Sequence, residues 1–327
     1  MAFDGITIAN LVHELSGALA GGRISKIAQP EKDELLFTIK NYRDTYRLLL
    51  SANPGLPLIY LTESSKQSPM TAPNFCMLLR KHIGGGRILS VSQPGLERII
   101  HLEIEHLDEM GDLCRKRLIV EMMGKHSNII FVDGEDRIID SIRHVSAQLS
   151  SVREVLPGRT YFIPQTVEKF DPFSVTEKEF SGFLKASSAP ASKTLYTHLT
   201  GISPIMAEEL CHMASVDADR SASMMSEAEI THLNRMFTLV MDDVRAGHFS
   251  PVMILENQTP VEFSALPLSC FEGGNYEHVS YDSVSRLLED YYASKNTVSR
   301  IRQKSVDLRK IVQTALERNY KKYDLQL

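Results

Sequence analysis

The polar insert from Glu121 to Asn128 carries the side chains best suited to holding a ligand. It offers in succession a carboxylate, two thioethers, a glycine, an amine, an imidazole, a hydroxyl and an amide. Polar loops held between buried strands often display binding groups. A wide turn, in which Ser127 and Asn128 satisfy their own backbone, would have the same composition. Residue types alone leave both interpretations open. The insert reads Glu121, Met122, Met123, Gly124, Lys125, His126, Ser127 and Asn128.

Two apolar segments flank this insert and must position it. Residues 118–120 and 129–132 are β-branched runs of strand length. Asp133-Gly134 then opens a turn toward Arg137, which is a typical hairpin signal. We therefore expect the insert to join two neighbouring strands of one sheet.

Length and composition indicate an ordinary globular protein. A chain of 327 residues with 43% apolar and 24% charged residues is expected to hold two or three domains. No apolar run approaches the ~18 residues that cross a bilayer, and the first residues do not resemble a signal peptide. The four cysteines are scattered, which suits a reducing compartment. We expect a cytoplasmic protein with no membrane segment, no metal and no cofactor.

Charge is distributed unevenly along the chain. From Thr297 onward there are eight Lys/Arg and three Asp/Glu, a balance of +5. Because the net charge of the whole chain is −5, the residues before Thr297 sum to −10 (−5 minus 5). This pattern suits contact with nucleic acid at chosen patches. A solvated basic helix end would have the same composition.

The first 171 residues form the first expected domain, which is rich in strands. Apolar spacing predicts helices over 6–19 and 71–83, the second with Thr71 as N-cap, and about eight strands between residues 23 and 139. This combination favours an α+β fold with a layer or sandwich of strands. The strands are expected at 23–27, 34–39, 42–50, 58–61, 87–92, 98–104, 117–120, 129–132 and 137–139.

The second expected domain, residues 172–285, is mainly helical. Capping boxes at 174–177 and 226–229 predict helix starts, and a short helix is expected over 193–199. Ser203-Pro204 supplies an N-cap and first turn for another helix. Helix, glycine turn and helix fit either a phosphate-binding helix-hairpin-helix, with Gly201 and Ser203 at the phosphate, or a plain helical hairpin. Strand-like pieces at 252–256, 261–263 and 266–271 and a helix at 281–293 follow, and residues 286–327 are expected to begin a coiled coil.

Several motifs occur together and in order, and they resemble those of the NFACT family. This family includes the bacterial RqcH proteins, also called fibronectin-binding proteins (FbpA, PavA). The resemblance covers essentially the whole chain, and the run from Met123 to Asn128 is its most specific part. The second arm of the coiled coil and the C-terminal NFACT-R domain have no counterpart here. The motifs are Met1-Ala2-Phe3-Asp4-Gly5, Gly21-Gly22-Arg23-Ile24, residues 75–82, Asp112, residues 121–129, Val155-Leu156-Pro157-Gly158 and Gly201-Ile202-Ser203-Pro204.

The resemblance implies a fold and a role. The fold would be an Fpg/Nei-like β-rich domain followed by a helix-hairpin-helix-like domain and a coiled-coil arm. The role would be ribosome-associated quality control: binding the large ribosomal subunit blocked by peptidyl-tRNA, and recruiting alanyl-tRNA for template-free alanine tailing. Such a protein binds tRNA and rRNA and needs no catalytic residue of its own.

The resemblance also assigns residues. The family's Asp-Arg pair for tRNA corresponds to Glu97 and Arg98, with the acid one methylene longer. Contacts to the anticodon arm correspond to Glu121, Met122, Met123, Gly124 and Lys125, and we add His126 and Asn128. Without the family, Glu97 and Arg98 would suggest only a surface ion pair.

Two other functions remain as alternatives. A fibronectin-binding adhesin is suggested by the names used in the family, although no export signal is seen. A nucleic-acid enzyme of DNA-glycosylase descent is the other, although Ala2 replaces the N-terminal proline nucleophile of those enzymes.

Overall fold

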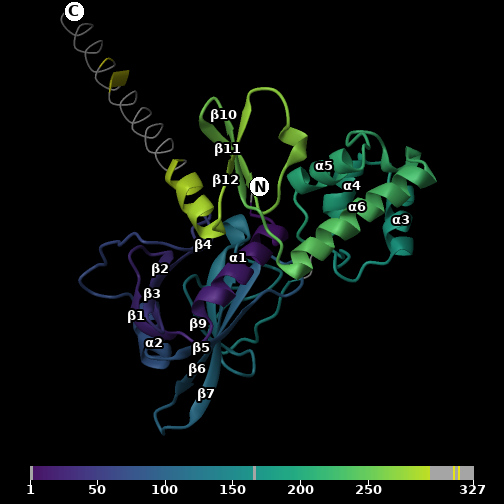
Figure 1. The fold of residues 1–327 in the computed structure, drawn as a ribbon. Coiled ribbons are helices and arrows are strands. Elements are labelled where there is room, and N and C mark those ends of the chain that lie inside the picture. The colour runs from purple at the N-terminus through teal and green to yellow at the C-terminus, as the bar shows by residue number, and fades with distance from the viewer. Residues whose placement is uncertain (1–2, 165–166, 295–311, 314–315, 317–327) are drawn as a thin grey trace, which may run out of the picture.

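The computed structural model describes residues 3–164, 167–294, 312–313 and 316. Its largest element is a nine-stranded antiparallel sheet with the order β4-β3-β2-β1-β5-β6-β7-β8-β9 (Figure 1). The predicted α+β class is confirmed, and the expected strands are present. They are β1 Arg23–Ala28, β2 Glu34–Asn41, β3 Asp44–Ser51, β4 Leu58–Leu61, β5 Arg87–Ser92, β6 Ile99–Leu107, β7 Leu113–Glu121, β8 Asn128–Val132 and β9 Ile138–Ser141.

Two helices pack on this sheet and share its main core. In α1 (Gly5–Leu19), the Asp4 side chain caps the first turn by accepting from the Thr7 N–H at 2.8 Å. In α2 (Asn74–Ile83), Pro73 occupies the N-cap position, so the prediction of Thr71 as the cap was wrong. Both helices bury their apolar faces against strands, which removes apolar surface from water.

Alternate residues of β6, β7 and β8 face two different cores. Ile100, Leu118 and Phe131 belong to the main core, whereas Ile99 and Ile119 belong to a smaller one on the opposite face. The segment that follows β9 covers this second face with Val155 and Tyr161. Both faces of these strands are therefore buried, which explains their continuous apolar runs.

The β8–β9 hairpin forms as predicted, with a wider connection than two residues. Ile130 pairs with Ser141 and Val132 with Ile138. Asp133 Oδ1 accepts from the N–H groups of Glu135 and Arg137, both at 2.9 Å. The left-handed residue is Asp136, at φ 60°, so Gly134 does not supply the positive φ.

The helical part contains α3 (Glu177–Ala186), α4 (Ala191–His198), α5 (Pro204–Met213) and α6 (Glu227–Ala246) around a core of its own. Ser203 and Pro204 begin α5 as predicted. The box at 226–229 is confirmed, and Gly247 ends α6 in the left-handed region. The capping box expected at 174–177 was wrong: the box that begins α3 uses Thr176 and Glu179. Ser174 belongs to the preceding turn, where its N–H donates to Asp171 O.

A second, three-stranded sheet of order β11-β10-β12 lies beside α1 (Figure 1). Its strands are β10 (Val252–Glu256), β11 (Thr259–Ser264) and β12 (Tyr276–Ser280). The strand predicted over 266–271 was wrong, because residues 269–271 form a 3-10 turn held to Glu209 by Ser269 and Cys270. The sequence reading also missed β12.

Residues 284–294 form the described part of a helix that packs on the main core through Val284, Leu287 and Tyr291. The predicted coiled coil falls mostly outside the described residues. None of the helices described is both long and apolar enough to cross a membrane.

Candidate functional site

Glu97 and Arg98 lie in the turn that leads from β5 into β6. The Glu97 N–H donates to Pro94 O at 3.0 Å, and the Gln93 side-chain amide donates to Gly5 O and Glu97 O at 2.9 and 2.8 Å. The Met122 N–H donates to Arg98 O at 2.9 Å. Backbone contacts on both sides therefore fix where the Arg98 side chain starts.

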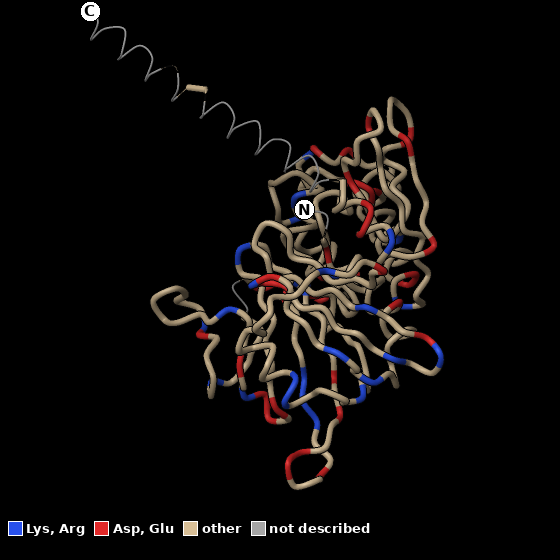
Figure 2. Tube along the Cα trace, turned by 90° about the vertical axis from the view of Figure 1, so that its left-hand side faces the viewer, with Lys and Arg blue, Asp and Glu red and all other residues tan. Residues whose placement is uncertain are grey.

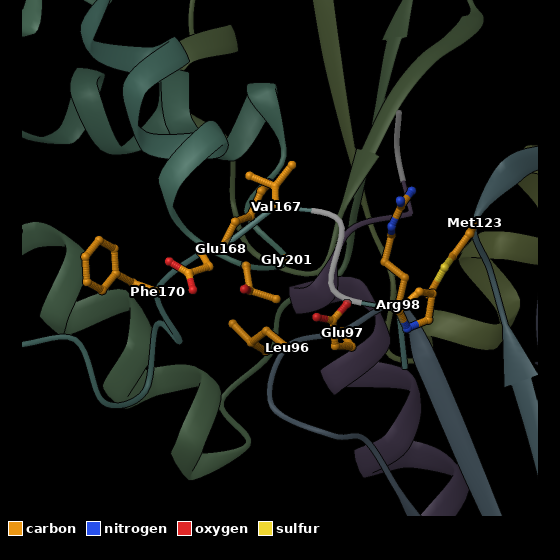
Figure 3. Close-up of a pocket in the computed structure, with 11 residues that line it drawn as sticks. Leu96, Glu97, Arg98, Met123, Val167, Glu168, Phe170 and Gly201 are labelled. Atoms are coloured by element: carbon orange, nitrogen blue, oxygen red, sulfur yellow. The ribbon is translucent and has the colours of Figure 1, made fainter. Parts of the chain in front are cut away.

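Arg98 borders a cavity of about 670 Å³ between the main sheet and the helical part. Figure 3 shows Arg98 and Met123 close together on one side, with Val167, Glu168 and Phe170 on the other. Leu96, Glu97 and Gly201 lie between these groups. The full lining is Leu96, Glu97, Arg98, Met123, Pro164, Val167, Glu168, Lys169, Phe170, Thr200 and Gly201.

A second cavity of about 180 Å³ shares Arg98, Lys169 and Gly201 with the first. It is also lined by Asp4 and Tyr196. The Lys169 ammonium donates to Tyr196 O at 2.8 Å. Two cations therefore stand where the cavities meet, a suitable arrangement for a phosphate of a larger ligand.

Partial burial controls the electrostatics of this cluster. Burial lowers the pKa of Arg98, and Glu97 and Asp4 oppose that shift. Burial raises the pKa of Glu97, while Arg98 and Lys169 act in the opposite direction. Burial and the Arg98 charge lower the pKa of Lys169. Each charge is thus held where water screens it poorly, so a bound anion would interact strongly with both cations.

Glu121 does not face either cavity. Its carboxylate is fully buried, forms an ion pair with Arg153 and accepts from the Tyr161 hydroxyl at 2.9 Å. Burial and the Glu121 charge raise the pKa of Tyr161, which keeps that hydroxyl a donor. Direct contact between Glu121 and tRNA would require breaking this pair. We therefore revise its predicted role from contact to support.

Met122 and Asn128 are buried as well, at 1% and 2% exposure. The Asn128 amide donates to Arg143 O at 2.8 Å, and Ser127 Oγ accepts from the Met123 N–H at 2.9 Å. These contacts fit the wide-turn interpretation. We revise the roles of Met122 and Asn128 to support in the same way.

Met123, Gly124, Lys125 and His126 are the accessible part of the insert. Gly124 to His126 form a 3-10 turn, with Gly124 at φ 58°. Lys125 and His126 are exposed, and Met123 lines the main cavity beside Arg98. Of the predicted tRNA-binding residues, the structure brings Glu97, Arg98 and Met123 together.

Gly201 and Ser203 hold chain segments together. A Cβ on Gly201 would lie 2.1 Å from Leu96 O, and the Gly5 N–H donates to Gly201 O at 2.8 Å. Ser203 Oγ donates to Asp4 Oδ2 at 2.7 Å and accepts from the Met206 N–H. An internal carboxylate thus already lies at the start of α5, so the structure does not support Ser203 as a phosphate ligand, whereas Gly201 borders both cavities.

The sequence did not predict that Lys169, Glu168 and Tyr196 line the two cavities. Lys169 lies in an irregular segment without periodicity or motif, and only the fold brings it beside Arg98. Its one signal in the sequence was position: a lysine close to the predicted boundary between the first two domains.

The family model described as NFACT N-terminal and middle domains matches residues 4–326. The chain belongs to the NFACT family. The Rqc2 homolog RqcH of Bacillus subtilis is 34% identical over 323 residues, which cover 98% of this chain and 54% of that protein. This NFACT chain spans about half the length of the curated relatives it matches.

Two solved structures resemble this NFACT chain closely in fold. One is the fibrinogen binding protein from Staphylococcus aureus, with TM-score 0.74 and 30% identity, covering 89% of this chain and 99% of that one. The other is the N-terminal part of the fibronectin/fibrinogen-binding protein from Streptococcus suis, with TM-score 0.72, 31% identity and the same coverage.

Proposed function

We propose that this chain is the tRNA-binding part of a ribosome-associated quality control factor. It would bind the large ribosomal subunit that still carries peptidyl-tRNA and recruit alanyl-tRNA for C-terminal alanine tailing. The main support is its likeness to RqcH along nearly its full length, together with an arginine and a lysine that meet at the cavities beside the family motif.

The proposed contact set is narrower than the family motif. Arg98 and Lys169 would bind backbone phosphates, and Glu97 would hold Arg98 in place. Met123, Gly124, Lys125 and His126 would contact unpaired bases and phosphates of the anticodon arm, since loop bases are bound through their edges and by stacking. Glu121, Met122 and Asn128 would keep this turn in shape.

We also propose the domain division at residues 1–171, 172–285 and 286–327, with a glycosylase-like first domain, a helix-hairpin-helix-like second domain and a coiled-coil arm. The chain would act in the cytoplasm as a binding module. Peptide transfer would be left to the ribosome, because the proposed role needs no catalytic group on this chain.

The proposal is tested by measuring the binding of unfractionated tRNA to Arg98→Ala. Loss of a charge-assisted phosphate contact is expected to weaken binding at least about tenfold, which corresponds to roughly 1.4 kcal/mol. Arg235→Ala is the matched control, because it removes an exposed arginine from α6. Unchanged affinity of Arg98→Ala, or an equal loss in both variants, would contradict the proposal.

Fibronectin binding is a second candidate, because two similar structures carry that activity or a related one in their names. It is separated from the first by measuring immobilised fibronectin and purified large ribosomal subunits against the same preparation. Submicromolar binding to fibronectin that Arg98→Ala leaves intact, without binding to the subunit, would favour the adhesin.

A further inference from the structure

A third cavity, of about 510 Å³, lies at the far end of β6 and β7. The last turn of α2 and the β6–β7 hairpin form its walls, with Lys81, His82, His106 and Lys116 among the lining residues. Arg98 precedes β6 and His106 is near its end, so eight residues of extended chain, about 26 Å, separate this cavity from the proposed tRNA site.

Lys116 is a half-buried cation whose charge is not neutralised by an ion pair. Its ammonium lies 3.0 Å from His82 Nδ1, and no carboxylate of the described residues is within ion-pair distance. Burial lowers the pKa of Lys116, and Cys114, Asp108 and Asp133 oppose that shift. Holding such a charge away from water costs free energy, which a bound anion would recover.

Asp108 and Glu109 also line this cavity, and both carboxylates are already engaged. Asp108 Oδ1 accepts from the N–H groups of Met110 and Asp112, both at 2.9 Å, and its other oxygen contacts the Cys114 thiol at 3.6 Å. Glu109 pairs with Lys81 at 2.8 Å. Figure 2 shows acidic positions at the tip of this hairpin and basic positions along the strands behind it. The positive charge of Lys116 therefore remains available to a ligand.

His106 adds a polar atom of the opposite kind. The side chain is only 7% exposed, and its Nε2 has no hydrogen-bond partner among the described residues. Its Nδ1 lies 3.0 Å from Leu107 O. A carbonyl only accepts, so Nδ1 carries the proton and Nε2 of the neutral ring is an acceptor. The Lys116 ammonium only donates, so His82 Nδ1 is the acceptor in that contact and the neutral His82 ring carries its proton on Nε2.

The cavity thus combines donors from Lys116 and His82 with a buried acceptor on His106. A phosphate oxygen needs donors, and a ribose 2′-hydroxyl can donate to an acceptor beside it. We propose that this cavity binds one nucleotide of an RNA backbone, with its phosphate at Lys116 and His82 and its 2′-hydroxyl at His106. This would be a second RNA contact, distinct from Arg98, and it rests on the proposed function only in that the partner is RNA.

The experiment compares variants against two probes. Inorganic phosphate is titrated into the whole chain while NMR follows the histidine ring signals, with His82 assigned through His82→Asn. Burial and Lys116 lower the pKa of His82, so phosphate bound there is expected to raise it. Lys116→Met keeps the apolar stem and should abolish that response. Absence of any His82 response in the unaltered chain would overturn the site.

The second probe is unfractionated tRNA, bound over a range of salt concentrations. Lys116→Met is expected to lower the slope of log K against log salt by about 1, as one lost phosphate contact requires. Lys178→Met, which removes an exposed lysine from α3, is the control and should leave the slope unchanged. Phosphate binding with an unchanged slope would mean that the cavity takes free phosphate only, and would overturn the RNA assignment.

The third arm compares a single-stranded RNA with the DNA of the same sequence. His106→Phe fills the same buried space without an acceptor and should reduce the preference for RNA, whereas an unchanged preference would contradict the role of His106. Thermal unfolding checks that each variant folds. If Arg98→Ala weakens tRNA binding and Lys116→Met does not, the proposed function stands and this inference fails. If neither the unaltered chain nor any variant binds tRNA, the proposed function fails; this inference then stands if Lys116→Met weakens binding of the single-stranded RNA, and fails as well if it does not.

Discussion

Two glutamate–arginine pairs lie near the end where β6 begins and β7 finishes, and they differ in what surrounds them. Glu121 and Arg153 form a closed pair, because the carboxylate also accepts from Tyr161 and Arg153 donates to Phe162 O at 2.7 Å. Glu97 and Arg98 border open cavities beside Lys169. The comparison teaches that burial separates residues that are open to a ligand from residues that hold neighbouring chain segments in shape.

The largest expected effect is a loss of stability on removing one partner of the closed pair. Arg153→Ala leaves the Glu121 carboxylate buried without its counter-ion, which should lower the free energy of unfolding by about 3–5 kcal/mol. Urea denaturation measures this loss. Arg98→Ala, measured in parallel, should cost less than about 1 kcal/mol. If the two variants were equally stable, the distinction between the pairs would be wrong.

The next effect is a pH dependence of the free energy of unfolding, caused by His101 next to the closed pair. Burial first, and Arg117 second, lower the pKa of His101 to about 4, with Asp136 opposing. On acidification, His101 therefore binds a proton near pH 6.5 in the unfolded chain but only near pH 4 in the folded chain. Stability contributed by the neutral ring is full above pH 6.5 and falls by at most about 3 kcal/mol on acidification to pH 4. Tyr161 also faces this ring, at 6.5 Å between centroids.

Thermal unfolding between pH 8 and pH 4 checks this prediction, with His101→Gln as the comparison. That variant should have a flatter profile over this window. Identical profiles would show that His101 is not held in its neutral form by the fold.

A smaller effect is expected within the accessible turn. Lys125→Ala removes an exposed cation and should weaken tRNA binding about threefold to tenfold, with no change in unfolding midpoint, because its side chain packs against no core. Gel-shift titration at fixed salt measures it. Glu121→Gln should show the reverse pattern, with a lower midpoint and a smaller change in affinity per folded molecule.

The smallest effect concerns the length of the acid in the open pair. Glu97→Asp keeps the charge and restores the usual family residue, so binding of tRNA should change by less than about threefold. Glu97→Ala should weaken tRNA binding more, because Arg98 would lose the carboxylate that offsets the effect of burial on its charge. A large loss in Glu97→Asp would mean that the longer acid contacts the ligand itself.

Local signals were sufficient for much of the fold. Apolar periodicity located the strands on either side of the insert, and Ser203-Pro204 and the Ser226–Glu229 box located helix starts. These features depend on residues close in sequence. The turn at Ser269 depended on Glu209, a tertiary partner that periodicity does not reveal. The Thr176 cap depended on a local turn at Asp171, which shifts the start of α3 past Ser174.

The candidate site was harder to predict for the same reason. Glu121 and Lys125 look equally polar in sequence, yet Arg153 and Tyr161 bury the first and leave the second in solvent. Lys169 and Arg98 are 71 positions apart, and no spacing rule connects them. Family resemblance pointed to residues around the two cavities, whereas burial separates the accessible side chains there from the enclosed ones.

The place where Gly5, Leu96 and Gly201 cross has a practical consequence for producing this protein. Phe3 and Asp4 line the smaller cavity, so residues fused ahead of Met1 are joined to the chain only two residues before Phe3. A purification tag at that end would compete for the entrance, and a preparation could then look inactive for reasons unrelated to its sequence.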